Sequence, residues 1–199
     1  MTLGGGGPPP EDAQARFPSF LRALRIGRAP NKPMIDTGYV QRMARYNRWQ
    51  NQNLYGVADT LSDTERRRER GAFFGSIHAT LNHLLWADRI WMYRLAGTPR
   101  PDGGIPESVS IYDDWNDLKH ERTGFDTVML DWAERLDSAA LAGELTWYSG
   151  AMKAQVCKPK WLLVTHMFNH QTHHRGQVHC MLTQAGGKPS DTDLPFMPM

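Results

Sequence analysis

Four long segments of this chain repeat apolar residues every three or four positions, and this rhythm limits the folds open to it. The segments span about residues 36–61, 73–96, 113–137 and 159–185 of the 199. A spacing of three and four places apolar side chains on one face of an α-helix, whereas a strand needs strict alternation. The third segment shows the rhythm in Trp115, Leu118, Phe125, Met129, Trp132 and Leu136. The pattern therefore predicts an all-α protein built from four amphipathic helices.

The connections between these segments predict how the helices are arranged. The link 62–72 is short and charged, and the link 97–112 is rich in proline and glycine and long enough to cross over a bundle. The link 138–158 holds an apolar run at 145–148 and a second short run that ends at Val156, which predicts a small β-hairpin between the third and fourth helices. Four amphipathic helices with one or two long crossovers are typical of a four-helix bundle.

Residues 1–33 differ in composition from the rest and are predicted to form a disordered tail. They hold six of the 13 prolines and a run of four glycines, and such a stretch buries too little apolar surface to offset its ordering entropy. A short amphipathic targeting helix is one alternative, because helical spacing relates Phe17, Phe20, Leu21 and Leu24. Another is that translation begins at Met34. Residues 34–199 are expected to form one domain.

Charge and hydropathy argue against nucleic acid and membranes as partners. The formal net charge of +2 divides into +3 for residues 1–33 and −1 for residues 34–199, so the predicted domain lacks the basic stripe that binds phosphate backbones. No apolar run approaches the roughly 20 residues that span a bilayer. The two cysteines, Cys157 and Cys180, are too few for a disulfide framework and favour a reducing, cytoplasmic setting. Both are expected to be ordinary packing residues.

Histidines cluster near the C-terminus, where five of the eight lie between residues 166 and 179. On a helical wheel of the fourth segment, His170 and His174 fall inside the arc that holds Leu163 and Met167. Two imidazoles one turn apart on a core-facing surface can converge on a single metal ion. The alternative is a pair of buried histidines that are hydrogen-bonded to neighbouring groups.

A third ligand would have to come from a facing helix, and the candidates are His78, His83 and His120. The wheel does not favour His83, because this residue falls on a second face of its helix, beside Ala87 and Ile90. A bundle helix touches two neighbours, so a second face can also be buried. By its position alone, His83 is interpreted as an interfacial histidine bonded to a nearby group.

Five other side chains are candidates for polar groups near such a site. Asn47 and Asn51 share an arc with apolar residues of the first helix, so these amides either enter the core and orient ligands or are solvated. Trp147, Tyr148 and Arg175 could line a cleft, although Arg175 equally suits a surface position or a salt bridge between helices. Position in the sequence leaves these alternatives open.

Two segments of the chain resemble the second and fourth helices of the DinB family. Residues 76–91 read SIHATLNHLLWADRIW, and residues 166–177 read HMFNHQTHHRGQ, which includes the family's His-His-Arg-Gly-Gln signature. Their order and their separation of about ninety residues also match. The resemblance covers about residues 34–199.

The resemblance implies an up-down-down-up four-helix bundle, expected to be a homodimer. It also implies a divalent transition metal, zinc or nickel first, held by His83, His170 and His174. Three imidazoles leave at least one coordination position for water or substrate.

The family and its relatives include metal-dependent transferases and isomerases that use low-molecular-weight thiols such as bacillithiol, mycothiol or glutathione. The expected function is a metal-dependent thiol S-transferase, isomerase or hydrolase that acts on a small molecule. The alternative is a non-catalytic, stress-related, dimeric bundle that binds metal.

Overall fold

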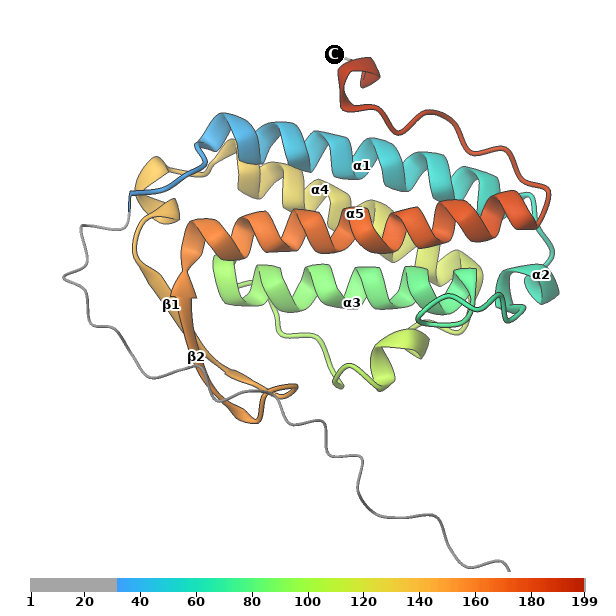
Figure 1. Cartoon of the computed structure of the whole chain (residues 1–199), viewed down its shortest axis with the longest axis horizontal. Helices are drawn as coiled ribbons and strands as arrows, with labels where there is room; N and C mark the ends of the chain where they lie inside the picture. The colour runs from blue at the N-terminus through green and yellow to red at the C-terminus, as the bar shows by residue number, and fades with distance from the viewer. Residues whose placement is uncertain (1–31, 199) are drawn as a thin grey trace, which may run out of the picture. The chain divides into compact units, whose positions relative to one another are not determined.

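The computed structural model describes residues 32–198, and within them four long helices confirm the predicted bundle. They are α1 (Thr37–Asp59), α3 (Ile77–Ala96), α4 (Trp115–Glu134) and α5 (Lys160–Gln184). Figure 1 shows them running alongside one another. The predicted tail falls almost entirely outside the described residues. No helix within 32–198 is both long and apolar enough to cross a bilayer.

The helices run up, down, down and up, as the resemblance implies. α1 is antiparallel to α4, α4 is parallel to α3, and α3 is antiparallel to α5. Two contacts in each pair of helices show this: from one contact to the next, the residue numbers rise in both helices of a parallel pair, but rise in one and fall in the other of an antiparallel pair. These contacts are Arg45–Glu134 and Asp59–Lys119 for α1 and α4, His78–Trp115 and Asp88–Arg122 for α4 and α3, and His83–His170 and Trp91–His166 for α3 and α5.

Side-chain caps begin three of the helices within a few residues of the predicted positions. Asp36 accepts a hydrogen bond from the Tyr39 amide at 2.7 Å, and Ser76 and Asp114 cap α3 and α4 in the same way. Each cap satisfies amides that the start of a helix leaves unpaired. α3 begins at residue 77 rather than near 73, because the preceding residues form a tight turn in which Gly75 has a φ of 77°.

The predicted β-hairpin between α4 and α5 is present. β1 (Glu144–Ser149) pairs antiparallel with β2 (Ala154–Pro159), and Trp147 lies opposite Val156. Figure 1 shows the hairpin extending away from the helices at one end of the bundle.

The prediction that the two cysteines are packing residues is wrong, because both are exposed. Cys157 lies on β2, which has only one partner strand and is mostly exposed along its length. Cys180 lies on the outer side of α5, although the next residue, Met181, is buried. The exposure of the two cysteines follows from how the hairpin and α5 pack in the folded chain. The local sequence pattern does not report that packing.

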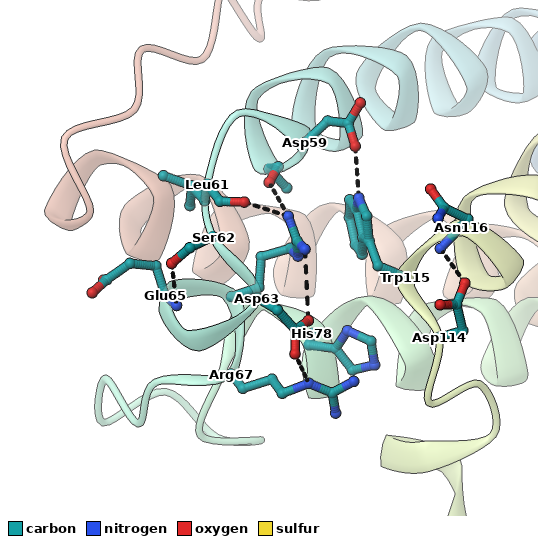
Figure 2. Close-up of polar contacts among 12 residues, drawn as sticks. Asp59, Leu61, Ser62, Asp63, Glu65, Arg67, His78, Asp114, Trp115 and Asn116 are labelled. Atoms are coloured by element: carbon teal, nitrogen blue, oxygen red, sulfur yellow. Dashed lines mark hydrogen bonds and ion pairs between the residues drawn. The ribbon is translucent and has the colours of Figure 1, made fainter.

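The charged link between α1 and α3 contains a short helix, α2 (Asp63–Arg67), that the sequence pattern does not predict. Arg66 is buried, donates to the carbonyl oxygen of Leu61 and lies over the ring of Trp115, with 4.7 Å from Cζ to the ring centre. Trp115, the first residue of α4, donates from Nε1 to Asp59 at 2.7 Å, a hydrogen bond drawn as a dashed line in Figure 2. These contacts hold the end of α1, α2 and the start of α4 together.

The core of the described residues contains two large apolar clusters and a smaller one around Trp86, Ala87 and Ile90, and polar side chains lie between the two large clusters. One cluster includes Leu81 and Leu182, the other includes Met92 and Phe168, and all four side chains are fully buried. Between the clusters lies a group of buried polar side chains that we call the ion layer, which consists of Asn51, Asp88, Arg122, Asp126 and Gln171.

Arg122 holds the ion layer together. Its guanidinium lies 2.6 Å from Asp88 and 2.8 Å from Asp126. Asn51 donates to Asp126 at 2.9 Å, and Gln171 donates to Asp88. Burial lowers the pKa of Arg122, but the charges of the two carboxylates more than offset burial, so the pKa is raised and the side chain stays charged. The ion layer therefore connects α1, α3, α4 and α5.

Replacing Arg122 by methionine is expected to lower the free energy of unfolding by about 3–5 kcal/mol, because it leaves two buried carboxylates without their cation. Urea denaturation followed by circular dichroism measures the loss. Arg45→Met is the matched control: Arg45 pairs with Glu134 at 2.6 Å, but both side chains are half exposed, so the expected loss is below about 1 kcal/mol. Equal losses in the two variants would contradict the prediction.

Candidate metal centre

The structure brings together His83, His170 and His174, the three residues that we call the histidine triad. His83 comes from α3, and the other two lie one turn apart on α5. One ring nitrogen from each lies within 4.8 Å of the others. His83 and His174 are buried, and His170 is half-buried. Within residues 32–198, no other group of three histidine, cysteine or acidic side chains is gathered in this way.

The spacing of two of the ring nitrogens matches that of metal ligands. Nε2 of His83 lies 3.4 Å from Nε2 of His170. Two imidazole nitrogens bound tetrahedrally to one zinc ion, each at about 2.0–2.1 Å, would stand about 3.3 Å apart. The two rings therefore have the separation of a ligand pair. Imidazole is a ligand that suits zinc, nickel, copper and iron, so the donor set fits a divalent transition metal.

A hydrogen bond sets the tautomer of His83. Its Nδ1 lies 2.7 Å from Oγ of Ser108, in the short 3₁₀ helix η1 (Glu107–Ser110). The serine hydroxyl donates its single hydrogen to the Ile105 carbonyl oxygen at 2.6 Å, so it accepts from the Nδ1–H of His83. The lone pair of His83 is then on Nε2, the nitrogen that faces His170. The loop between α3 and α4 thus prepares His83 for metal binding.

A second hydrogen bond orients His174 in the same way. Its Nδ1 lies 2.8 Å from Oε1 of Gln177, one turn further along α5. An amide oxygen only accepts, so Nδ1 carries the proton and Nε2 carries the lone pair. Both residues belong to the His-His-Arg-Gly-Gln motif, and this contact gives the spacing of the motif a physical reason.

Burial keeps the triad neutral. Burial and the charge of His174 lower the pKa of His83 to about 4. Burial and the neighbouring histidines lower the pKa of His170 to about 3, and burial also lowers the pKa of His174. Neutral imidazole is the form that binds metal, so few protons compete for these nitrogens near neutral pH.

An aromatic side chain packs against the triad from the turn that precedes α3. The ring centre of Phe74 lies 3.9 Å from that of His83 and 5.2 Å from that of His174. Its neighbour Phe73 is 77% exposed. The apolar pattern of segment 73–96 does not indicate that Phe74 contacts histidines, so its place beside the triad is visible only in the structure.

A cavity of about 800 Å³ includes His83 and His170 in its wall. The wall is formed by α3, the loop that follows it, the β-hairpin and the first half of α5. Trp147 and Tyr148, whose place the sequence leaves open, line this cavity. Arg175 does not, because it is buried in the core and donates to the side chain of Asn47.

The amides of α1 enter the core, but they do not reach the triad. Asn47 and Asn51 are both buried, and they bond to Arg175 and Asp126 respectively. Of the two alternatives left open for them, the solvated one is therefore wrong. Their contacts align α1 with α4 and α5 rather than orient the histidines.

The other candidates for a third ligand lie away from the triad. Nε2 of His78 lies 2.9 Å from the carbonyl oxygen of Tyr112, and His120 is exposed on α4. His166 is closer, with its ring centre 5.8 Å from that of His170, and it lines the same cavity. The structure thus selects His83 from the three candidates, although the helical wheel does not favour it.

The lowered pKa values predict that the stability of the metal-free protein depends on pH. Below about pH 6.5 the unfolded chain binds protons at His83 and His170, whereas the folded chain does not until about pH 4 and about pH 3. The free energy of unfolding should therefore fall as the pH is lowered from 6.5 toward 4. Urea denaturation at about pH 7 and about pH 5 measures the fall. This decrease in the free energy of unfolding should be smaller in the His83→Gln, His170→Gln double variant. An equal decrease in the parent protein and the variant would refute the prediction.

The comparisons with known proteins agree with this geometry. The sequence pattern of the DinB family matches residues 34–199. Protein DinB of Bacillus subtilis (strain 168) is 26% identical to this chain over 159 residues, which cover 76% of this chain and 89% of that protein. The family match spans the four long helices and the histidine triad. The chain therefore belongs to the DinB family.

Proposed function

We propose that this protein is an enzyme that holds a divalent transition metal, zinc or nickel, with His83, His170 and His174 and acts on a low-molecular-weight thiol. The reaction class is thiol transfer to a second small molecule, or a thiol-dependent isomerisation or hydrolysis. Family membership and the gathering of the three imidazoles support the metal site.

The observation that carries the catalytic part of the proposal is the cavity that reaches the triad. Its volume of about 800 Å³ lies within the range of sites that bind small molecules. Structural zinc sites usually have four protein ligands, whereas catalytic sites keep a position open for water or substrate. Three histidines beside a cavity fit the second description.

The chemistry of thiol activation suits this arrangement. A bound divalent metal lowers the pKa of a coordinated thiol or water, which makes either one a nucleophile near neutral pH. Ser108 and Gln177 hold His83 and His174 in the tautomer that presents Nε2. Phe74 packs against both rings and keeps water away from that side. The chain thus supplies fixed, neutral nitrogen ligands and a partly dry surrounding.

Protein purified without a histidine tag is expected to contain about one zinc or nickel ion per chain, measured by elemental analysis. The His83→Ala variant should lose the metal, because only two imidazole ligands remain and together they bind it more weakly. His120→Ala is the control, since His120 is exposed on α4 and outside the triad, and it should keep the metal. Absence of metal from the parent protein, even after zinc or nickel is added, would refute the metal site.

The metal-loaded protein is expected to accelerate the attack of a thiol on 1-chloro-2,4-dinitrobenzene. The thiol loses its proton to solvent, a sulfur–carbon bond forms, and the carbon–chlorine bond breaks to release chloride. Glutathione, bacillithiol and mycothiol are each tested, and product absorbance gives the rate. The rate should fall to that of the uncatalysed reaction in His83→Ala and remain in His120→Ala. A protein that binds the metal but accelerates none of the three reactions would favour the non-catalytic, metal-binding alternative.

A further inference from the structure

Two arginines in the wall of the cavity have no acidic partner. Arg94 lies near the end of α3, Arg100 lies in the loop that follows, and both line the cavity. No aspartate or glutamate is among the residues that line it. Across residues 32–198, no carboxylate stands within ion-pair distance of either side chain.

The unpaired state of Arg94 is unusual for this protein, because arginines that are similarly shielded have partners. Arg122 contacts two carboxylates, and Arg89 pairs with Glu121 and bonds to Tyr112. Burial, and then the charge of Arg100, lower the pKa of Arg94. Arg94 is half-buried and Arg100 is exposed, so a partly shielded cation lies near a second cation at the mouth of the cavity. An anion bound beside Arg94 would relieve both the shielding of its charge and the repulsion from Arg100.

Two tryptophans hold Arg94 in place. Its Cζ lies 4.8 Å from the ring centre of Trp91 and 5.6 Å from that of Trp147. The two indoles are 5.7 Å apart and meet at 72°. Contact of a guanidinium with an aromatic face involves its charge and uses none of its hydrogen-bond donors. The two indoles therefore hold Arg94 in the wall of the cavity and leave its N–H groups available to a ligand.

A continuous wall leads from Arg94 to the histidine triad. Trp91 lies 5.2 Å from His166, and His166 lies 5.8 Å from His170, measured between ring centres. On α3, Ala87 and Ile90 complete this side of the cavity. Arg94 follows His83 by eleven residues, which corresponds to roughly 16 Å between their Cα atoms along the helix axis. The Arg94 side chain leans back toward the N-terminus of α3, over Trp91, so the gap that a ligand must span is shorter. The wall is thus aromatic or apolar in its middle and polar at its two ends.

We propose that Arg94 and Arg100 form an anion-binding subsite that receives the carboxylate of a small-molecule substrate. The flat or apolar middle of this substrate lies along Trp91 and Trp147, and its other end reaches the histidine triad. A guanidinium edge matches a carboxylate with two parallel hydrogen bonds. This inference deepens the proposed function. It rests on that function only for the statement that the other end of the substrate reacts at the histidine triad. It names the substrate class as carboxylates with an aromatic or apolar body.

The test compares two probes that differ only at one end, 4-(mercaptomethyl)benzoate and 4-(mercaptomethyl)benzamide. Calorimetric titration of the zinc-loaded protein should show that the carboxylate binds at least about ten-fold more tightly, as expected for charge-assisted hydrogen bonds. The Arg94→Gln, Arg100→Gln double variant should bind both probes equally. The Arg42→Gln, Arg45→Gln double variant loses the same charge from the exposed surface of α1 and should keep the preference.

A second pair of probes separates this inference from the proposed function. 4-Methylbenzoate and 4-methylbenzamide carry no metal-binding group and are titrated into the metal-free protein. If zinc does not bind but the benzoate is still preferred, and the preference is lost with Arg94 and Arg100, then the metal-dependent function fails and the subsite stands. Circular dichroism shows whether each variant is folded.

Three results would overturn the subsite. The first is equal binding of carboxylate and amide by the parent protein. The second is no detectable binding of either pair of probes. The third is a preference for the carboxylate that survives in the folded Arg94→Gln, Arg100→Gln variant.

Discussion

The buried contacts of Arg122 determine how the four long helices align, and the histidine triad depends on that alignment. Two carboxylates meet one guanidinium at 2.6 and 2.8 Å, in a core where an unpaired charge would cost several kcal/mol. Sliding α3 by one turn along α4 would remove Asp88 from its partner. His83 lies five residues before Asp88, and Gln171, which donates to Asp88, directly follows His170. The contacts that satisfy the buried charges therefore also bring the imidazoles together.

The helices set the positions of the histidines, and shorter segments set their orientation. Ser108, in η1, bonds to Nδ1 of His83, and Phe74, in the turn before α3, packs against the same ring. Only Gln177 acts from within a long helix, because it lies one turn from His174. The rigid bundle thus brings the ligands near one another, and the loops choose the tautomer and shield one side. The loops also leave the cavity on the remaining side open to a small molecule.

The parts of this structure that the sequence predicts are those that depend on local periodicity. The four helices, the hairpin and the inward position of His170 and His174 all follow from spacing within one segment. His83 does not, because its face of α3 has a second neighbour, and only the family resemblance selects it. Its contacts with Ser108 and His170 span 25 and 87 residues. A helical wheel reports only the faces of one helix, so it cannot predict contacts between such distant residues. α2 is missed because five mostly charged residues carry no periodic signal.

Burial alone does not distinguish a charge that holds the fold from a charge that serves a ligand. Arg122 and Arg175 are both almost fully buried, and both bond to groups within the protein. Arg94 is half-buried, faces the cavity and has no acidic partner in residues 32–198. Partial desolvation of a charge without an acidic partner destabilises the folded chain. The contacts with Trp91 and Trp147 offset part of that cost, and a ligand of opposite charge would offset more of it. The absence of an acidic partner, more than the depth of burial, therefore separates the arginines that build this bundle from those that line its cavity.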